Sequence, residues 1–218
     1  MEITWYGHSC FRLTERNLAT VVCDPFDHKH VGYDALKLKA DIVTVSHESP
    51  SHNFIQAVKS DPRLINGAGE FEIGGVFITG VQTNGHSKKT EAEPVNTLYL
   101  FDYNGVTVLH LGDLNRVPSQ TEVEDLGPVH IVLAPVGGVG CLNAAKAAEV
   151  VSLLEPNIVI PMHFSTPATT LKLDSLQKFL KEMGQENVET LPSIKVPGKG
   201  SLPDETRVVV LEYEHNKD

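Results

Sequence analysis

The sequence predicts one domain, residues 1–218, of the α/β (α+β) class. Two patterns support this class. The first half is dominated by short runs of β-branched and aromatic residues separated by Gly and Asn, and the second half alternates such runs with helical segments. A chain of 218 residues is also long enough to bury a sizeable core without disulfides.

The first half is expected to form strands bounded by turn residues. Asn104-Gly105 is a strong two-residue hairpin signal. One helical segment, roughly Asn53–Ser60, interrupts this half. The expected strands are Glu2–Trp5, Cys10–Thr14, Thr20–Cys23, Ile42–Val45, Val76–Val81, Thr97–Phe101 and Val106–Leu109.

The second half is expected to alternate strands and helices. Asn143 is a suitable N-cap because its side chain can accept a hydrogen bond from the first helical turn. Pro156 and Gly184 end the two helices. The expected strands are Val129–Ala134, Asn157–Pro161 and Arg207–Glu212, and the expected helices are Asn143–Leu154 and Ser175–Met183.

The charge and the composition exclude several classes of partner. The net charge of -10 argues against nucleic acid and anionic membranes, because phosphate binding needs clustered Lys and Arg. The start of the chain lacks a basic region followed by an apolar run, and no apolar run suggests a transmembrane helix. Three widely spaced cysteines fit reduced thiols, so we expect a cytoplasmic protein.

Several histidines and one aspartate follow expected strands. They are His47, His52, His86, Asp113 and His163. Strand ends hold side chains rigidly while leaving them open to substrate, and imidazole with carboxylate suits zinc. Taken singly, each residue also fits a polar turn or a satisfied core histidine. Their repeated placement favours a shared site.

An ordered set of motifs carries a family resemblance over Met1 to about Phe164. The motifs are GHSCFRL, VVCDPF, SHESPSHN, HLGDLN, APVGG and IPMHF. In this order they resemble the small cytoplasmic hydrolases of the metallo-β-lactamase superfamily, close to the ascorbate-6-phosphate-lactonase-like group. The resemblance implies a four-layer αββα sandwich with a metal site at one edge between two mixed sheets.

The same resemblance assigns roles to individual residues. His47 and His86 match ligands of a first metal site, while His52 and His163 match the second. Asp113 matches the bridging ligand, and Asp113 and His163 are the expected catalytic residues. The implied reaction is attack by metal-bound hydroxide on a lactone, ester or phosphoester of a small anionic substrate.

The chain departs from the family motif H-x-H-x-D-H at two positions. Ser49 stands where the first site expects histidine, and Ser51 stands where the second expects aspartate. Serine is a poor metal ligand, so we expect one divalent ion, zinc with manganese or nickel as alternatives, or none. The alternative function is a degenerate, non-catalytic protein that binds a ligand or a partner.

Five further residues are candidates around the site. Asp24 and His8 are expected to support the ligands, Asp24 by hydrogen bonds to the turn that carries His47. The alternatives are an Asx-type turn before Pro25 for Asp24 and a purely structural role at the first hairpin for His8. His28 and His30, read as alternating residues of an extended segment, and Cys141 are the places where missing ligands could be replaced. For these three, a solvated loop or an inert thiol is the competing interpretation. His110 has no evident partner.

Overall fold

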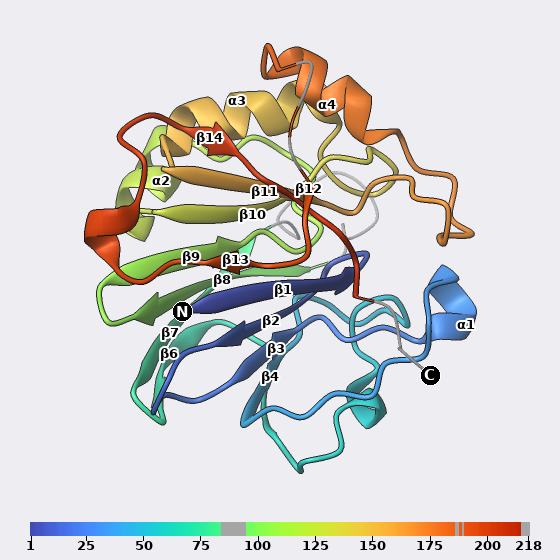
Figure 1. Ribbon diagram of the computed structural model, residues 1–218, viewed down its shortest axis with the longest axis vertical. Coiled ribbons are helices and arrows are strands. Elements are labelled where there is room, and N and C mark those ends of the chain that lie inside the picture. The colour runs from blue at the N-terminus through green and yellow to red at the C-terminus, as the bar shows by residue number, and fades with distance from the viewer. Residues whose placement is uncertain (84–94, 186–187, 189, 215–218) are drawn as a thin grey trace.

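Two β-sheets form the centre of the molecule (Figure 1). The structure is a computed structural model, and it describes residues 1–83, 95–185, 188 and 190–214. The six-stranded sheet has the order β13 (Ile194–Lys195), β1 (Glu2–Gly7), β2 (Cys10–Thr14), β3 (Val21–Cys23), β4 (Ile42–Thr44) and β5 (Arg63–Ile65). The seven-stranded sheet has the order β14 (Arg207–Val208), β11 (Ile158–Met162), β10 (Ile131–Pro135), β9 (Val106–His110), β8 (Asn96–Tyr103), β7 (Val76–Thr83) and β6 (Gly69–Ile73). A two-stranded sheet pairs β12 (Thr190–Leu191) with β15 (Val210–Leu211).

Helices form the outer layers of the predicted four-layer sandwich. In Figure 1, α2 (Gln120–Leu126), α3 (Ala144–Leu154) and α4 (Leu176–Glu182) lie on the side of the seven-stranded sheet. The other outer layer consists of α1 (His28–Val31), the 3-10 turn Ile55–Ala57 and loops. Near the C-terminus, a second 3-10 turn covers Lys199–Ser201. The helices in the described part of the chain are too short to span a bilayer, since α3, at 11 residues, exceeds the others.

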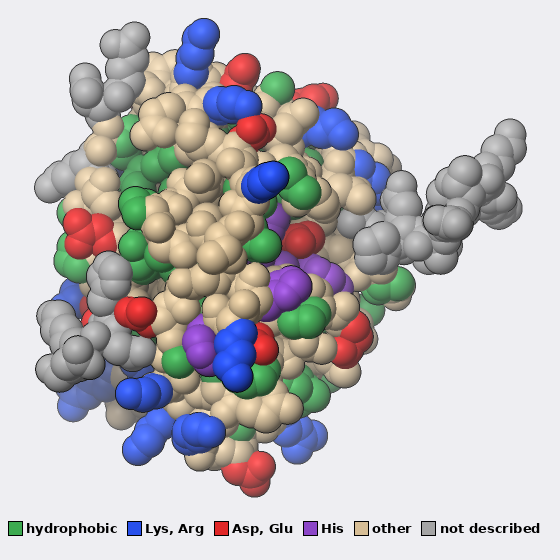
Figure 2. Space-filling view, turned by 90° about the vertical axis from the view of Figure 1, so that its right-hand side faces the viewer, with side chains coloured by type: hydrophobic (Ala, Val, Ile, Leu, Met, Phe, Trp, Pro, Cys, Tyr) green, Lys and Arg blue, Asp and Glu red, His purple; other side chains and the backbone are tan. Residues whose placement is uncertain are grey.

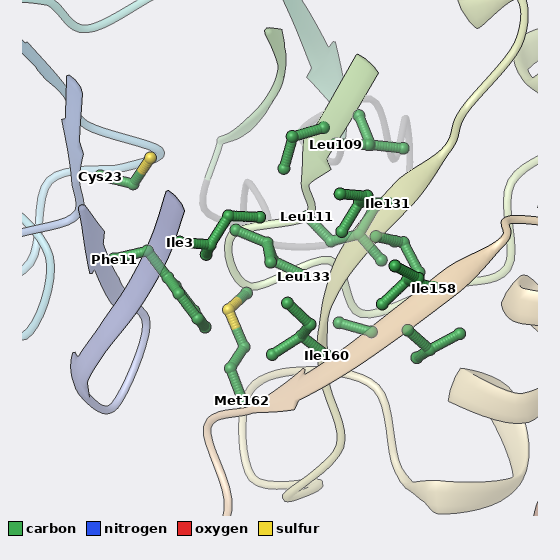
Figure 3. Packing of buried hydrophobic residues seen from close by; sticks show 14 of the residues in the cluster. Ile3, Phe11, Cys23, Leu109, Leu111, Ile131, Leu133, Ile158, Ile160 and Met162 are labelled. Atoms are coloured by element: carbon green, nitrogen blue, oxygen red, sulfur yellow. The ribbon is translucent and has the colours of Figure 1, made fainter. Parts of the chain in front are cut away.

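The main core lies between the two sheets. Ile3 and Phe11 of the six-stranded sheet point toward Leu133 and Met162 of the seven-stranded sheet (Figure 3). Strand β4 is buried on both faces, so its side chains alternate between two clusters: Ile42 packs between the sheets, whereas Val43 packs in the outer layer. This explains why the strand reads as a continuous apolar run.

Three local predictions were wrong. The expected helix Asn53–Ser60 is only a 3-10 turn, Ile55–Ala57. The Phe54 amide donates to Pro25 O at 2.7 Å and Ser60 Oγ bonds the Ala40 backbone, so both ends are tied to the loops after β3 and before β4. His28 and His30 lie on α1, not on an extended segment, because Asp27 caps that turn. The strand expected over Arg207–Glu212 is divided between β14 and β15, which join different sheets.

Parallel pairing brings the functional loops to one edge of the sandwich. Strands β9, β10 and β11 are parallel, and so are β3, β4 and β5. The carboxyl ends of parallel neighbours meet at the same edge of a sheet. The loops after β3, β4, β9 and β11, together with the β1–β2 turn, therefore carry side chains toward a common point.

Candidate metal centre

Three imidazoles surround the carboxylate of Asp113. His52 Nε2 lies 3.2 Å and His163 Nε2 lies 3.8 Å from Asp113 Oδ1, while His47 Nε2 lies 3.7 Å from Oδ2. One ligand atom from each of His47, His52 and Asp113 lies within 4.8 Å of the other two. The structure thus brings together four of the five predicted ligands. The fifth, His86, lies outside the described residues.

The outer nitrogen of each of these imidazoles faces a hydroxyl or a thiol. His47 Nδ1 lies 3.0 Å from Ser46 Oγ, and His52 Nδ1 lies 2.8 Å from Ser51 Oγ. His163 Nδ1 lies 3.0 Å from Cys141 Sγ. These contacts fix the rings so that Nε2 is the atom nearest Asp113.

The Asp24 contacts determine the tautomer of His47. Ser46 Oγ donates its hydrogen to Asp24 Oδ2 at 2.7 Å, so the hydroxyl can only accept from His47. His47 Nδ1 therefore carries the hydrogen, and Nε2 presents a bare lone pair to Asp113. Cys141 allows the same tautomer at His163, because its thiol faces Leu142 O at 3.5 Å as a donor.

This arrangement fits a cation. Bare imidazole nitrogens and a carboxylate are all acceptors, so they repel one another unless a positive charge lies between them. Asp113 Oδ1 is buried and has no hydrogen-bond partner among the described residues, although His52 Nε2 is close. Imidazole and carboxylate are also the donors that zinc prefers at catalytic sites.

The ionisation states agree with a cation site. Burial raises the pKa of Asp113, but the neighbouring His163 and His52 outweigh it and hold this pKa well below its usual value. Burial, followed by the charge of His52, lowers the pKa of His47. Burial also lowers the pKa of His163 despite Asp113. At neutral pH the site therefore contains an ionised carboxylate next to the neutral imidazoles of His47 and His163.

His52 is shifted in the opposite direction. Burial lowers its pKa, but the charge of Asp113 at 3.2 Å, together with the charge of Asp24, raises it above the usual value. Protons therefore compete with a metal ion more strongly at His52 than at His47 or His163.

Close packing of backbone holds Asp113 in place. The Asp113 amide donates to Asn96 Oδ1 at 2.8 Å, and Asn96 Nδ2 donates to Leu111 O and Thr83 Oγ1. Gly112 has φ +54°, and a Cβ there would collide with Asn96 and Ser46. The loops after β4 and β9 can approach each other only because this residue is glycine.

Several supporting residues were not predicted. His110 is fully buried, its Nε2 faces Ser9 O at 2.8 Å, and its Nδ1 lies 3.9 Å from Asp24 Oδ2. Ser9 Oγ also lies 3.2 Å from His52 Nε2. His110 ends a strand, as the predicted ligands do, and that position was the available signal. Ser9 could not be assigned, because its partners are far away in the sequence.

The two serines that replace motif ligands, Ser49 and Ser51, contact each other. Ser49 Oγ lies 2.7 Å from Ser51 Oγ, and Ser51 Oγ bonds His52. Ser51 thus holds the outer nitrogen of the ligand His52 and does not itself face Asp113 as a ligand. Cys141 lies on the Nδ1 side of His163, away from Asp113, and His28 is half-buried and pairs with Asp27.

The centre reaches solvent through part of its rim. The side chain of Asp113 is 18% exposed and that of His47 is 14% exposed, whereas His52 is fully buried. Figure 2 looks onto this edge of the sandwich and shows histidine side chains gathered near the middle of the face. A small molecule can therefore approach from the side of His47 and Asp113.

The family follows from a sequence match. Residues 2–163 match the model of the beta-lactamase superfamily domain. The chain belongs to the metallo-β-lactamase superfamily. A solved structure from Thermotoga maritima, assigned to the Zn-dependent hydrolases of this superfamily, is 34% identical with a TM-score of 0.78, and the match covers 96% of this chain and 97% of that one.

Other relatives agree with this membership. A UPF0173 protein from Pyrococcus furiosus is 26% identical, with 92% of this chain and 99% of the relative covered. A UPF0173 metal-dependent hydrolase from Lysinibacillus sphaericus is 28% identical, with 76% and 86% covered. Igni18, a metallo hydrolase from Ignicoccus hospitalis, shares the superfamily fold with a TM-score of 0.64 at 18% identity, over 89% of this chain and 98% of that chain.

Proposed function

We propose that this protein is a metal-dependent hydrolase that holds one divalent ion at Asp113. The main support is that three imidazoles turn Nε2 toward one ionised carboxylate. Their outer nitrogens are held by Ser46, Ser51 and Cys141. Zinc suits this donor set, with manganese or nickel as alternatives. The names of the UPF0173 relatives support the same activity.

The reaction class is hydrolysis of a lactone, ester or phosphoester. A divalent ion in such a site acidifies water to a pKa of about 7 and polarises the substrate. Asp113 and the three histidines would hold the ion, and Asp24 with Ser46 keeps His47 in the ligating tautomer. Ser51 stands where an aspartate would orient water and accept its proton. A neutral hydroxyl does neither task well, so we expect slow turnover.

A small anionic substrate fits the charge of the centre. Among the four proposed ligands, Asp113 is the only charged one. A divalent ion with a single carboxylate leaves a net positive centre, which attracts a phosphate or carboxylate group. The partner we propose is therefore a small molecule, and the acidic chain gives no support for nucleic acid or a membrane.

Metal content is the first test. The protein should be purified without chelators and without a metal-binding affinity tag. It should then contain about one equivalent of metal per chain, or take up that amount when zinc, manganese or nickel is added, as measured by inductively coupled plasma mass spectrometry. Asp113→Asn should lose this ion. His30→Ala removes an exposed histidine on α1 and should keep it. Less than about a tenth of an equivalent, with no uptake of added metal, would exclude the metal-dependent reaction.

Turnover is the second test. Metal-loaded and chelator-treated protein should be compared on a panel of lactones and phosphodiesters, with Asp113→Asn as the inactive control. The alternative is a protein that binds a ligand without converting it, and the neutral Ser49–Ser51 pair favours it. Full metal occupancy without hydrolysis of any panel member above the Asp113→Asn background would favour that alternative.

A further inference from the structure

His8 is a buried imidazole whose two nitrogens have no hydrogen-bond partner among the described residues. Only 1% of the residue is exposed, and neither Nδ1 nor Nε2 is paired. In contrast, His47, His52 and His163 each have Nδ1 in contact with a side chain. Burying polar nitrogen atoms without partners is unfavourable, so this side chain requires an explanation. A satisfied core histidine would not leave both nitrogens bare.

The backbone of His8 is held in an unusual conformation. Its φ is +49°, a value that residues other than glycine rarely adopt. The His8 carbonyl accepts from Trp5 Nε1 at 3.0 Å and from the amide of His163 at 3.1 Å. The turn is therefore tied to the loop that carries a proposed ligand. Residues whose strained backbone is held in place by such surrounding contacts are concentrated at functional sites.

The ring of His8 lies beside the two ligands on the Oδ1 side of Asp113. Its centroid is 4.1 Å from the ring of His163 and 5.0 Å from the ring of His52. These are the histidines whose Nε2 atoms approach Asp113 Oδ1. The superfamily motif has an aspartate at position 51 on this side, and here Ser51 turns its hydroxyl to His52 Nδ1 instead. The Oδ1 side therefore lacks one donor and contains one unpartnered imidazole.

We propose that His8 is a further ligand of the ion held at Asp113 Oδ1. It would replace the aspartate carboxylate of the family motif, which is absent here because position 51 is serine. This inference rests on the proposed function, because it requires that the protein bind a metal. The resulting donor set would add His8 to His47, His52, His163 and Asp113. It would contain one negative charge, where the complete motif would supply two.

Cobalt binding separates a ligand from a neighbour. Co²⁺ should be titrated into metal-free protein while its visible absorption is recorded, for the wild type, His8→Asn and His30→Asn. Asn tolerates a left-handed backbone, so the turn should be kept, and the thermal midpoint of the metal-free protein reports whether it is. We expect His8→Asn to bind Co²⁺ more than about 100-fold more weakly, beyond the range for residues that only support a ligand. Its absorption bands should also change, whereas His30→Asn should match the wild type.

Restoring the carboxylate provides the matched rescue. In the His8→Asn background, Ser51→Asp should recover most of the affinity and bring back intense Co²⁺ bands. An affinity of His8→Asn within about threefold of the wild type, or any loss with unchanged bands, would overturn the proposal, because a supporting residue alters affinity without replacing a donor. If the wild type binds no Co²⁺, the proposed function itself fails and this inference fails with it.

Discussion

Replacing Asp24 by Asn tests whether hydrogen bonds outside the centre set the tautomer of His47. Asp24 is fully buried, and its oxygens accept from the amide and the hydroxyl of Ser46, both at 2.7 Å. An Asn side chain keeps an acceptor for the amide but turns its NH2 group toward the hydroxyl. The hydroxyl would then donate to His47 Nδ1, which lies 3.0 Å away. His47 would carry its hydrogen on Nε2 and lose the lone pair that faces Asp113.

The expected magnitude follows from the bond that is lost. A hydrogen bond to a charged group contributes about 1.5–3 kcal/mol, so metal-free Asp24→Asn should lose roughly 2 kcal/mol of the free energy of unfolding. For a chain of this length that is a fall in Tm of roughly 4–8 °C. The zinc affinity should fall about 10–100-fold, as it does when a ligating histidine loses its outer partner.

The assay is a thermal melt of metal-free protein combined with a zinc titration against a chromophoric chelator. Ser46→Ala is the matched background, because it removes the atom through which Asp24 reaches His47. In that background Asp24→Asn should have little further effect on zinc affinity, since the two changes act through one contact. An unchanged dissociation constant in Asp24→Asn, or an equal fall with Ser46 present or absent, would refute the reasoning.

Three further predictions concern the ligand support, the core and a surface helix. Cys141→Ala should lower zinc affinity about 10-fold by freeing the outer nitrogen of His163, and Cys141→Ser, which keeps a partner there, should retain it in the same titration. Leu133→Ala, at a fully buried position between the sheets, should cost about 2–5 kcal/mol in urea unfolding, and a loss below about 1 kcal/mol would mean that the cavity collapses. Hydrogen bonds from Arg116 and then from the backbone at the start of α2 lower the pKa of Glu122 to about 2, so the stability that it adds is present above about pH 4.5 and is lost as the pH falls toward 2. Glu122→Gln should therefore be less stable than the wild type at pH 7, by no more than about 1 kcal/mol because the pair is partly exposed, with the difference vanishing near pH 2 in acid titrations of stability.

The edge that carries the centre could be predicted from the sequence because strand periodicity is a local signal. His47, Asp113 and His163 each follow a buried β-branched run, and the ends of parallel strands meet. The N-cap at Asn143 was predicted for the same local reason and is confirmed, since its side chain accepts from the amide of Lys146. Local patterns identified which residues end strands, but not which atoms they turn inward.

Other features depend on contacts that no local pattern contains. The segment after Asn53 looks helical, yet its ends bond to Pro25 and Ala40, which lie far away in the sequence. Strand β6 was not predicted because glycines flank its short run, with Gly67 before it, Gly69 at its start and Gly74-Gly75 after it, although its pairing with β7 makes it an edge strand. The contact of His110 with Ser9 joins the end of β9 to the β1–β2 turn of the other sheet. Tertiary pairing decided each of these, and propensity did not.

The two serines affect the two sides of Asp113 unequally. The contact of His47 with Asp113 is to Oδ2, at 3.7 Å, while His52 and His163 approach Oδ1 at 3.2 and 3.8 Å. A catalytic zinc site requires at least three protein ligands and an open position. His47, His52 and Asp113 already place three ligand atoms within 4.8 Å of one another, and the unpartnered ring of His8 lies next to the rings of His52 and His163. A first ion should therefore bind against Asp113 in contact with both His47 and His52, where His163 and His8 can complete its ligands. Because a neutral imidazole there would replace a carboxylate, that ion should keep more of its positive charge, which favours an anionic substrate over a neutral one.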